Sequence, residues 1–357
     1  MNQIPLILLT GFLGSGKTTL LNALLKTSEL ANTAVLINEF GEVSLDHHLV
    51  ETAIDSTVVL NNGCICCTVR GELAGALYKL YTQREDKTLP EFQRVIIETT
   101  GLADPAPILY ELLSHPLMRQ HYRLTGVITC VDGVLGMEQL DREIEPLKQA
   151  AVADRLLITK SDLAKTEDLA NLTLRLQTLN PVANITLSDP ASVDPNWILN
   201  TTIYDPTTKH ADVSKWLTAE KYRQLPVRAS QTIPSAQDVT RSTRDINRHD
   251  DRIHAFCMTF DEPIPWNALL KALQMLVAMQ SDHILRIKGI IHVENEEQPR
   301  IIHCVQHLIF DTATLEHWPN DQKTTQLVFI VRDITTEFIE VTLSHFIEAA
   351  KKRPGKV

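Results

Sequence analysis

A glycine-rich loop between a buried strand and a helix constrains this chain more than any other feature. Residues 11–18 read GFLGSGKT and fit the pattern G-x-x-x-x-G-K-[ST] in full. The apolar run Leu6–Leu9 precedes the loop, and the helix-forming run Thr19–Leu25 follows it. In this setting glycines let backbone N–H groups turn inward around phosphates, and the helix N-terminus adds partial positive charge. The sequence therefore predicts a phosphate-binding loop.

We expect every residue of this loop to take part in binding a nucleotide. Lys17 should reach the β- and γ-phosphates, and the hydroxyl of Thr18 should be a ligand of Mg²⁺. The other residues expected to line the phosphates are Gly11, Phe12, Leu13, Gly14, Ser15, Gly16 and Thr19.

A second apolar run, Val95–Ile97, ends in the acidic residue that such a site needs. Glu98 follows it directly and is expected to hold the magnesium ion through a water molecule. Gly101 comes three residues later and is expected to lie close to the γ-phosphate, as in loops that switch with the bound nucleotide. Many NTPases have Asp where this chain has Glu98.

The residues Thr159-Lys160-Ser161-Asp162 predict that the bound base is guanine. They follow the apolar run 155–158, where a base-reading loop belongs. The carboxylate of Asp162 can accept from two guanine N–H groups, and adenine lacks that pair of donors. The aliphatic stem of Lys160 would cover the base. We therefore expect GTP and GDP, and not adenine nucleotides, to be the ligands.

Five continuous apolar runs predict the fold class of the first part of the chain. Continuous runs, separated by segments long enough for crossover helices, are typical of parallel strands covered on both faces. The sequence therefore predicts an α/β P-loop NTPase fold with a doubly wound, mostly parallel sheet. The runs are Leu6–Leu9, Ala34–Ile37, Val95–Ile97, Val127–Val131 and Arg155–Ile158.

The pattern changes in the second half of the chain. At about 150 residues per domain, 357 residues correspond to about two domains. We expect a P-loop domain over residues 1–204, a polar linker over 205–252, and a smaller α+β domain over 253–357. The last unit should have a largely antiparallel sheet, because strand-like runs follow one another between two helical patterns. These elements are strands at 253–260, 284–293, 300–310 and 326–331 and helices around 266–277 and 338–347.

Charge and hydropathy exclude two classes of partner. The net charge of −10 repels phosphate backbones, so we expect no nucleic acid as the main partner. No run of about 18 apolar residues is present, so we expect no membrane-spanning segment. The N-terminus lacks a basic region and a cleavage site, and we interpret it as a strand and not a signal peptide. Three of the six cysteines fall within four positions, which suits a reducing compartment, and we expect a cytoplasmic protein.

The clustered cysteines predict a site for a soft or borderline metal ion. They are Cys64, Cys66 and Cys67. Thiolates bind Zn²⁺ and Cu(I), but one short cluster cannot easily supply four ligands. Glu39 and Glu42 follow the second predicted strand and could complete a mixed site, and His115 is a further candidate. The cysteines could instead be buried small apolar residues or a redox pair.

The remaining cysteines and two close histidines are expected in ordinary structural roles. Cys130, Cys257 and Cys304 lie in apolar runs, and we expect them in the core. His303 and His307 could share one face of a strand, but we expect them to be solvated or part of the core.

Taken in order, these motifs resemble those of the CobW/YjiA family of metal-handling P-loop GTPases. The resemblance rests on the segments GFLGSGKTT, NEFGE, NGCICC, ETTG followed by ADP, and TKSD. The second half is similar to the C-terminal domain of that family in the segments DDRIHAFCMTFDEPIPW, ILRIKGIIHV and HCVQH. The likeness covers nearly the whole chain except residues 205–250.

The resemblance implies a zinc chaperone that binds Zn²⁺ at the CxCC motif and passes it to a client metalloprotein in a GTP-dependent way. It implies that Cys66 is the central zinc ligand, with contributions from Cys64, Cys67 and Glu42, and that His115 belongs to a secondary site. Two positions depart from the family pattern. Some relatives have an acid where this chain has Ile37, so Glu39, a client residue or water would substitute as ligand. The linker also lacks the histidine-rich run that many relatives carry.

Other functions remain open at this point. The chain could insert another metal, such as cobalt in corrinoid synthesis, iron or nickel. It could also be a regulatory GTPase that only senses a metal. A scaffold with a degenerate phosphate loop is disfavoured, because Lys17, Thr18, Glu98 and Asp162 are all present.

Overall fold

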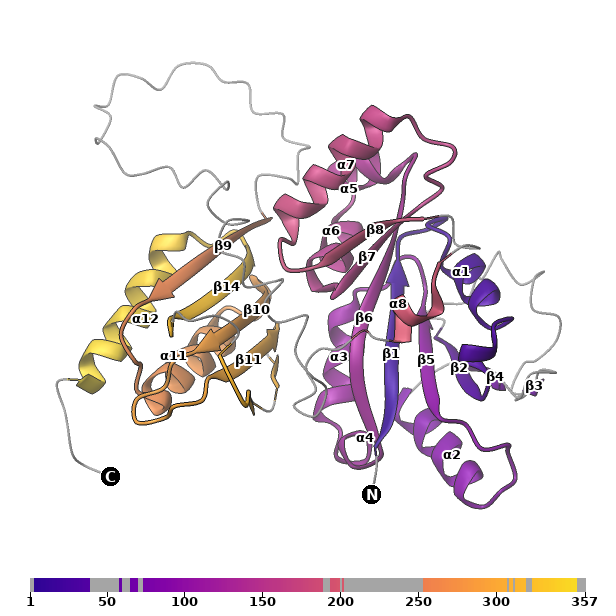
Figure 1. Ribbon diagram of the computed structural model, residues 1–357, viewed down its shortest axis with the longest axis horizontal. Helices are drawn as coiled ribbons and strands as arrows, with labels where there is room; N and C mark the ends of the chain where they lie inside the picture. Colours follow the sequence, from indigo (N-terminus) through magenta and orange to yellow (C-terminus); the bar gives the residue numbers. More distant parts are fainter. Residues whose placement is uncertain are drawn as a thin grey trace.

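A computed structural model gives the arrangement of the chain as two units, each built on one β-sheet (Figure 1). The described residues of the first unit run to residue 201 and those of the second start at residue 253, and the predicted linker lies outside the described residues. The structure describes residues 3–38, 58–59, 65–69, 73–188, 193–199, 201, 253–306, 308–310, 312–318 and 323–351.

The first sheet has the strand order β3-β4-β2-β5-β1-β6-β7-β8. Every neighbouring pair is parallel except β3 with β4, which is antiparallel. The five apolar runs are confirmed as strands, whereas the shorter β3, β4 and β8 were not predicted. The strands are β1 (Ile4–Gly11), β2 (Thr33–Asn38), β3 (Val58–Val59), β4 (Ile65–Val69), β5 (Arg94–Thr99), β6 (Tyr122–Asp132), β7 (Arg155–Thr159) and β8 (Asn184–Leu187).

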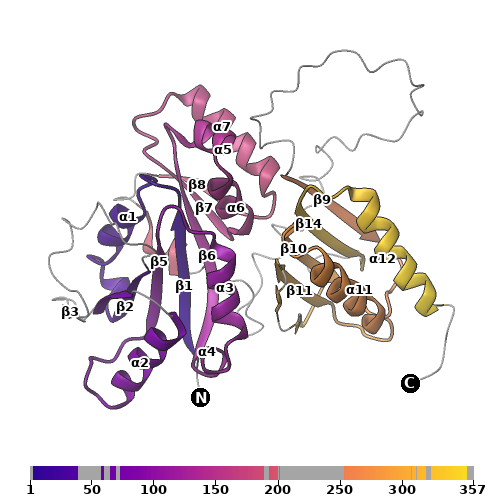
Figure 2. The ribbon, with the colours of Figure 1, turned by 180° about the vertical axis from the view of Figure 1, so that it is seen from behind.

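Helices cover both faces of this sheet, which explains why its strands are apolar throughout (Figures 1 and 2). Leu6 and Leu8 of β1 pack in a cluster with α2, α3 and α4, whereas Ile7 and Leu9 pack with α1 and α8 on the other face. The doubly wound α/β prediction is therefore confirmed. The helices are α1 (Lys17–Leu24), α2 (Leu73–Glu85), α3 (Pro105–Ser114), α4 (Pro116–His121), α5 (Gly136–Arg142), α6 (Ile144–Val152), α7 (Thr166–Leu179) and α8 (Pro195–Leu199).

The second sheet is antiparallel, with the order β12-β11-β10-β14-β9 and with β13 paired to β11. Two helices complete the unit, and the prediction of a smaller α+β domain is confirmed. Its elements are β9 (Ile253–Phe260), α11 (Trp266–Met279), β10 (Ile284–Ile291), β11 (Arg300–Val305), β12 (Leu308–Ile309), β13 (Ala313–Thr314), β14 (Thr325–Arg332) and α12 (Thr336–Lys351).

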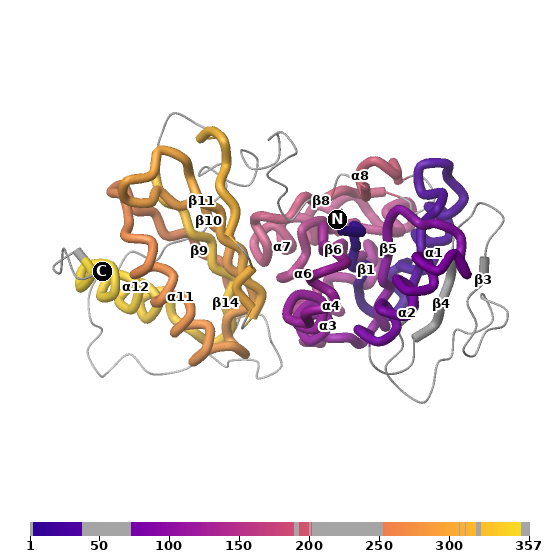
Figure 3. Tube along the Cα trace, turned by 90° about the horizontal axis from the view of Figure 1, so that it is seen from below, coloured from indigo at the N-terminus to yellow at the C-terminus, as the bar shows by residue number. Residues whose placement is uncertain are grey.

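The second sheet is covered on both faces, but by different units. Ile287 of β10 and Phe329 of β14 pack with α11 and α12. On the opposite face, Leu285 and Ile330 belong to the same apolar cluster as Leu147 of α6. Figure 3 shows α6 and α7 of the first unit beside this sheet, and α6 contacts β10 while α7 contacts β9. The two units therefore share a core.

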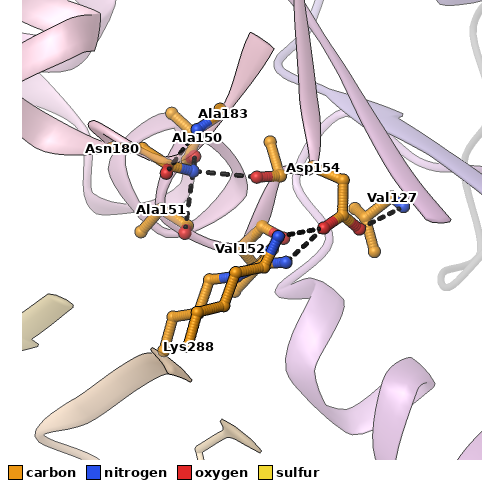
Figure 4. Close-up of polar contacts among 10 residues, drawn as sticks. Val127, Ala150, Ala151, Val152, Asp154, Asn180, Ala183 and Lys288 are labelled. Carbon is orange, nitrogen blue, oxygen red and sulfur yellow. Dashed lines mark hydrogen bonds and ion pairs between the residues drawn. The ribbon is translucent and has the colours of Figure 1, made fainter. Parts of the chain in front are cut away.

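A buried ionic cluster crosses the same boundary (Figure 4). Asp154, between α6 and β7, accepts hydrogen bonds from Lys288 Nζ at 2.7 Å and from the guanidinium of Arg286. Its second oxygen accepts from the backbone N–H of Val127 at 3.0 Å. Burial would raise the pKa of this carboxyl, but the two cations outweigh burial and hold its pKa well below the usual range. Asp154 is therefore ionised, and it neutralises charge that the second unit buries.

The last turn of α6 is fixed in the same place. Arg286 also donates to the carbonyl of Val152, and the side-chain amide of Asn180 donates to the carbonyls of Ala150, Ala151 and Ala153. These donors satisfy carbonyl groups that the end of a helix leaves without partners. Residues of both units thus cap one helix.

The cysteines expected in the core are buried with one exception. Cys130 and Cys304 are buried, but Cys257 is partly exposed because it lies on β9, at the edge of the second sheet. His303 is buried, as expected of a core histidine, and His307 lies outside the described residues. In the described part of the chain, no helix combines the length and the apolar character needed to cross a membrane.

Candidate functional site

The phosphate loop has the backbone conformation that its glycines predict. Gly11, Gly14 and Gly16 have φ values of +143°, +70° and +84°, a region that L side chains rarely adopt. A Cβ atom on Gly11 would also collide with the carbonyl oxygen of Cys130 on β6. Gly16 is the N-cap of α1, so the loop leads directly into the N-terminus of that helix. This is the geometry on which phosphate binding by backbone N–H groups depends.

Lys17 lies on the loop that it is predicted to serve. Its side chain folds back, and Nζ donates to the carbonyl oxygen of Phe12 at 3.0 Å. Lys17 is only 8% exposed. The side chain therefore holds its ammonium group within the loop and does not extend into solvent.

Thr18, in the first turn of α1, meets Glu98 near the end of β5, the strand next to β1. Leu9 of β1 pairs with Glu98 of β5, and the hydroxyl of Thr18 donates to Glu98 Oε1 at 2.6 Å. Glu98 is 4% exposed, so it is not the surface acid that a strand end often carries. A hydroxyl and a carboxylate are hard oxygen donors of the kind Mg²⁺ prefers, and the pair fits that ion.

Gly101 packs directly against the phosphate loop. A Cβ atom at this position would lie 2.7 Å from the backbone nitrogen of Leu13, so only glycine permits the approach. The turn is held from the other side by Gln149 of α6, whose amide donates to the carbonyls of Gly101 at 3.0 Å and Ala103 at 2.9 Å. Gln149 is fully buried. The structure thus places Gly101 against the phosphate loop, and its closeness to the γ-phosphate stays a prediction.

Sequence reasoning missed Gln149, although a signal exists. Its neighbours on α6 are apolar and buried, including Leu147 and Ala150. A lone amide in a buried apolar helix is rarely without hydrogen-bond partners. The position could have been singled out as a residue that bonds to another element.

The segment that is predicted to read the base is hydrogen-bonded to the phosphate loop. The hydroxyl of Thr159, at the end of β7, donates to the carbonyl oxygen of Ser15 at 2.9 Å. Lys160 and Asp162 follow on the same edge of the sheet, and Asp162 is exposed. The predicted phosphate-binding and base-binding residues therefore lie together at the end of the sheet where β1, β5 and β7 have their carboxyl ends.

Lys160 forms an ion pair with a residue that sequence reasoning did not identify. Its Nζ lies 2.6 Å from Oδ2 of Asp132, the last residue of β6. Burial would raise the pKa of Asp132, but hydrogen bonds from Lys160 and from the backbone N–H groups of Leu135 and Val134 outweigh burial, and the pKa is lowered. Asp132 is thus a carboxylate at neutral pH.

The predicted zinc ligands are only partly within the described residues. The main chain of Cys66 and Cys67 lies in β4, paired with Val35 and Leu36 of β2. Their side chains, together with Cys64, Glu39 and Glu42, lie outside what the structure describes. Among the side chains that are described, no three His, Cys, Asp or Glu groups gather where they could hold a metal ion.

His115 lies apart from the phosphate loop. It joins α3 to α4, and α4 leads into Tyr122, which pairs with Ile4 at the start of β1. His115 is therefore near the end of the sheet where β1 begins, whereas the phosphate loop follows the end of β1. Its role at a secondary metal site stays a prediction.

Comparison with known proteins agrees with this architecture. Residues 5–186 match the family described as CobW/HypB/UreG, nucleotide-binding domain, and residues 253–347 match the cobalamin synthesis protein cobW C-terminal domain. The protein named zinc chaperone YjiA of Escherichia coli (strain K12) is 31% identical over 345 residues, 96% of this chain and 99% of that protein. Zinc-regulated GTPase metalloprotein activator 1 of Schizosaccharomyces pombe is 31% identical over 193 residues, 52% of this chain and 46% of that protein.

A solved structure extends the likeness to three dimensions. The crystal structure of Zn(II)-bound YjiA GTPase from E. coli covers 97% of this chain and 99% of its own, with a TM-score of 0.73 and 28% identity. A glycine-rich loop between β1 and α1 and a buried acid at the end of β5, on a sheet of this order, define a nucleotide-binding protein of the P-loop NTPase fold. The chain belongs to the CobW/HypB/UreG family, with the CobW C-terminal domain, as the resemblance of its motifs indicated.

Proposed function

We propose that this protein is a GTP-hydrolysing zinc chaperone, which binds zinc at the CxCC motif and transfers it to a client metalloprotein in a GTP-dependent manner. The observation that carries the nucleotide half is the hydrogen bond from Thr159 to Ser15. It attaches the segment that contains Asp162 to the loop that binds phosphate. One nucleotide can then contact both segments, and a carboxylate at residue 162 favours guanine.

The residues around Glu98 support hydrolysis of the bound GTP. Phosphoryl transfer needs positioning and charge neutralisation more than covalent help from the protein. Lys17 and the N–H groups of the loop bind and orient the phosphates. Thr18 and Glu98 would hold Mg²⁺, which, when bound, neutralises charge on the β- and γ-phosphates. Gly101 brings the turn after β5 against the loop, where it can respond to the third phosphate. We expect slow intrinsic turnover that metal or client stimulates.

The relatives support zinc as the cargo. Two of them are named for zinc, and a structure of one was solved with Zn(II) bound. In this chain Cys66 is the proposed central ligand, with Cys64, Cys67, Glu39 and Glu42 as candidates for the rest of the site. Zinc binding at these cysteines would release the thiol protons, so the zinc affinity would fall as the pH drops.

The strand order supports coupling between zinc and nucleotide. Asn38 ends β2 beside Thr99 of β5, and Val69 ends β4 beside Asn38. The chain that continues from β2 to Glu39 and Glu42 therefore leaves the sheet next to the chain that continues from Glu98 to Gly101. β5 and β2 are adjacent strands, about 4.8 Å apart, and β4, which contains Cys66, is the next strand after β2. A change at the γ-phosphate could therefore reach the proposed zinc ligands through neighbouring strands.

A second candidate function is the insertion of another metal, such as cobalt. The name of the C-terminal domain, which refers to cobalamin synthesis, favours it. Ligand type alone does not separate these metals, because affinity of one site follows a general order across the divalent series. Competition between Zn²⁺, Co²⁺ and Ni²⁺ for the cysteine site distinguishes the two functions.

The nucleotide half is tested by the hydrolysis of GTP and ATP with the wild-type chain and Lys17→Ala. We expect hydrolysis of GTP but not ATP by the wild type, and loss of GTP binding in the variant. Lys26→Ala is the matched control, because Lys26 lies past the end of the same helix and is exposed. Full GTP binding and hydrolysis by Lys17→Ala would defeat this half of the proposal.

A further inference from the structure

The side chain of Asp132 is buried and held in one orientation by hydrogen bonds. It ends β6, and its side chain is 1% exposed. Oδ1 accepts hydrogen bonds from the backbone N–H groups of Val134 at 2.8 Å and Leu135 at 3.0 Å. This leaves Oδ2 aimed at Lys160, whose Nζ lies 2.6 Å away. The carboxylate that pairs with the lysine is therefore itself held by the turn that follows β6.

The main chain at Lys160 is held as tightly as its side chain. Lys160 has φ of +52°, a left-handed conformation that is uncommon for a residue with a Cβ atom. The residue before it is tied to the phosphate loop through the bond from Thr159 to Ser15. The carbonyl of Thr159 also accepts from the backbone N–H of Gly133, in the turn that follows Asp132. Both ends of the Lys160 side chain are thus attached to fixed parts of the site.

Stability does not explain this arrangement well. Lys160 is 37% exposed, and ion pairs with an exposed partner contribute little to the free energy of unfolding. A long lysine side chain that is free in solution has many rotamers, and fixing it at the moment of binding weakens affinity. A carboxylate that fixes it beforehand removes that loss.

We propose that Asp132 is a positioning residue for base recognition: it holds the ammonium of Lys160 so that the aliphatic stem of the lysine is in place to cover the guanine base before the nucleotide arrives. The inference rests on the proposed GTP-binding function and deepens it. Asp132 acts through Lys160 and makes no contact with the base. It therefore strengthens binding of guanine and hypoxanthine bases alike, because the stem covers the face of the base and does not read the 2-amino group.

The test is a double-mutant cycle on nucleotide affinity, measured with fluorescently labelled GDP and IDP. Asp132→Asn keeps an oxygen for the N–H groups of Val134 and Leu135 but removes the charge that holds Lys160. We expect it to weaken GDP and IDP binding equally, each by about tenfold. In a Lys160→Ala background the same substitution should no longer weaken binding. Asp162→Asn, in contrast, should weaken GDP binding more than IDP binding, because inosine lacks the 2-amino group.

Two further variants separate positioning from damage to the fold. Lys160→Met leaves Asp132 and its turn intact and should weaken GDP binding as much as Asp132→Asn does. Glu138→Gln removes the carboxylate of an exposed ion pair with Arg142 in the next helix and should bind GDP like the wild type. An unchanged GDP affinity in Asp132→Asn or Lys160→Met would overturn the inference, as would an undiminished effect of Asp132→Asn in the Lys160→Ala background. A wild-type chain that binds neither GDP nor IDP would instead defeat the proposed function itself.

Discussion

Asp154 of the first unit accepts a hydrogen bond from Nζ of Lys288 of the second unit at 2.7 Å, and both side chains are only 5% exposed. Arg286 reaches the same carboxylate. A buried charge is costly unless it is paired, so the two buried cations of the second unit depend on a carboxylate of the first unit as their ion-pair partner. With the shared apolar core, this contact joins the second unit to the first.

We predict that Asp154→Ala strongly destabilises the whole chain. The substitution leaves two buried cations without their carboxylate, and breaking a buried pair from one side costs about 3–5 kcal/mol. Urea denaturation followed by circular dichroism measures the loss, and Asp261→Ala, at an exposed position, is the control. Wild type should unfold in one transition, because the units share a core. Two separate transitions, with only the second shifted by Asp154→Ala, would contradict the account.

His303 should make stability depend on pH below neutrality. Burial first, and then the charges of Lys288 and Arg286, lower its pKa well below the ordinary value, although Asp154 acts in the opposite direction. Between that lowered pKa and about 6.5 the unfolded chain binds a proton that the folded chain does not. The free energy of unfolding therefore falls as pH drops through this window, by up to about 1.4 kcal/mol per pH unit.

The measurement for His303 is urea denaturation at a series of pH values between 7 and 5. His303→Gln cannot titrate, and we expect its stability to fall less steeply over this range than that of the wild type. His345→Gln removes an exposed histidine and should keep the wild-type slope. Equal slopes for wild type and His303→Gln would show that His303 does not carry the effect.

Gln149 is predicted to affect hydrolysis more than the binding of GDP. Gln149→Leu keeps the size of the side chain but removes both hydrogen bonds to the turn at Gly101. Each such bond contributes about 1 kcal/mol, so a loosened turn should lower kcat by about tenfold or more. GDP has no third phosphate, and its affinity should stay close to that of the wild type. Steady-state GTP hydrolysis and GDP titration measure the two quantities.

The control for this prediction is Gln120→Leu, an exposed glutamine on α4. A parallel loss of kcat and GDP affinity in Gln149→Leu would indicate general damage to the nucleotide site. The prediction is then wrong in its assignment of Gln149 to the turn that senses the third phosphate.

Local sequence patterns predicted the parts of this fold whose causes are local. The central strands appear as continuous apolar runs because helices cover both faces of the sheet. The phosphate loop can be recognised in the sequence because its backbone conformation requires glycine at positions 11, 14 and 16. The edge strand β8 lacks such a run, β3 is only two residues long, and neither strand was predicted.

Contacts between distant segments could not be predicted in the same way. Arg286 and Lys288 lie two residues apart in an otherwise apolar strand. This spacing predicts that both charged side chains are on one face of the strand. Nothing local identifies their partner, because Asp154 lies 134 residues before Lys288. Asp132 and Gln149 were missed for the same reason: each acts on a segment that only the folded chain brings near. The cysteine motif was predicted, but its side-chain geometry lies outside the described residues.

The central claim is that the nucleotide state controls zinc affinity. The most direct test is zinc affinity by competition with a chromophoric chelator, without nucleotide, with GDP and Mg²⁺, and with a non-hydrolysable GTP analogue and Mg²⁺. Cys66→Ser should abolish tight binding, and Cys257→Ser, at the edge of the second sheet, should not. The account predicts at least a tenfold difference between the GDP and GTP-analogue states, about 1.4 kcal/mol of coupling. Tight binding that is lost in Cys66→Ser but identical in all three states would contradict it.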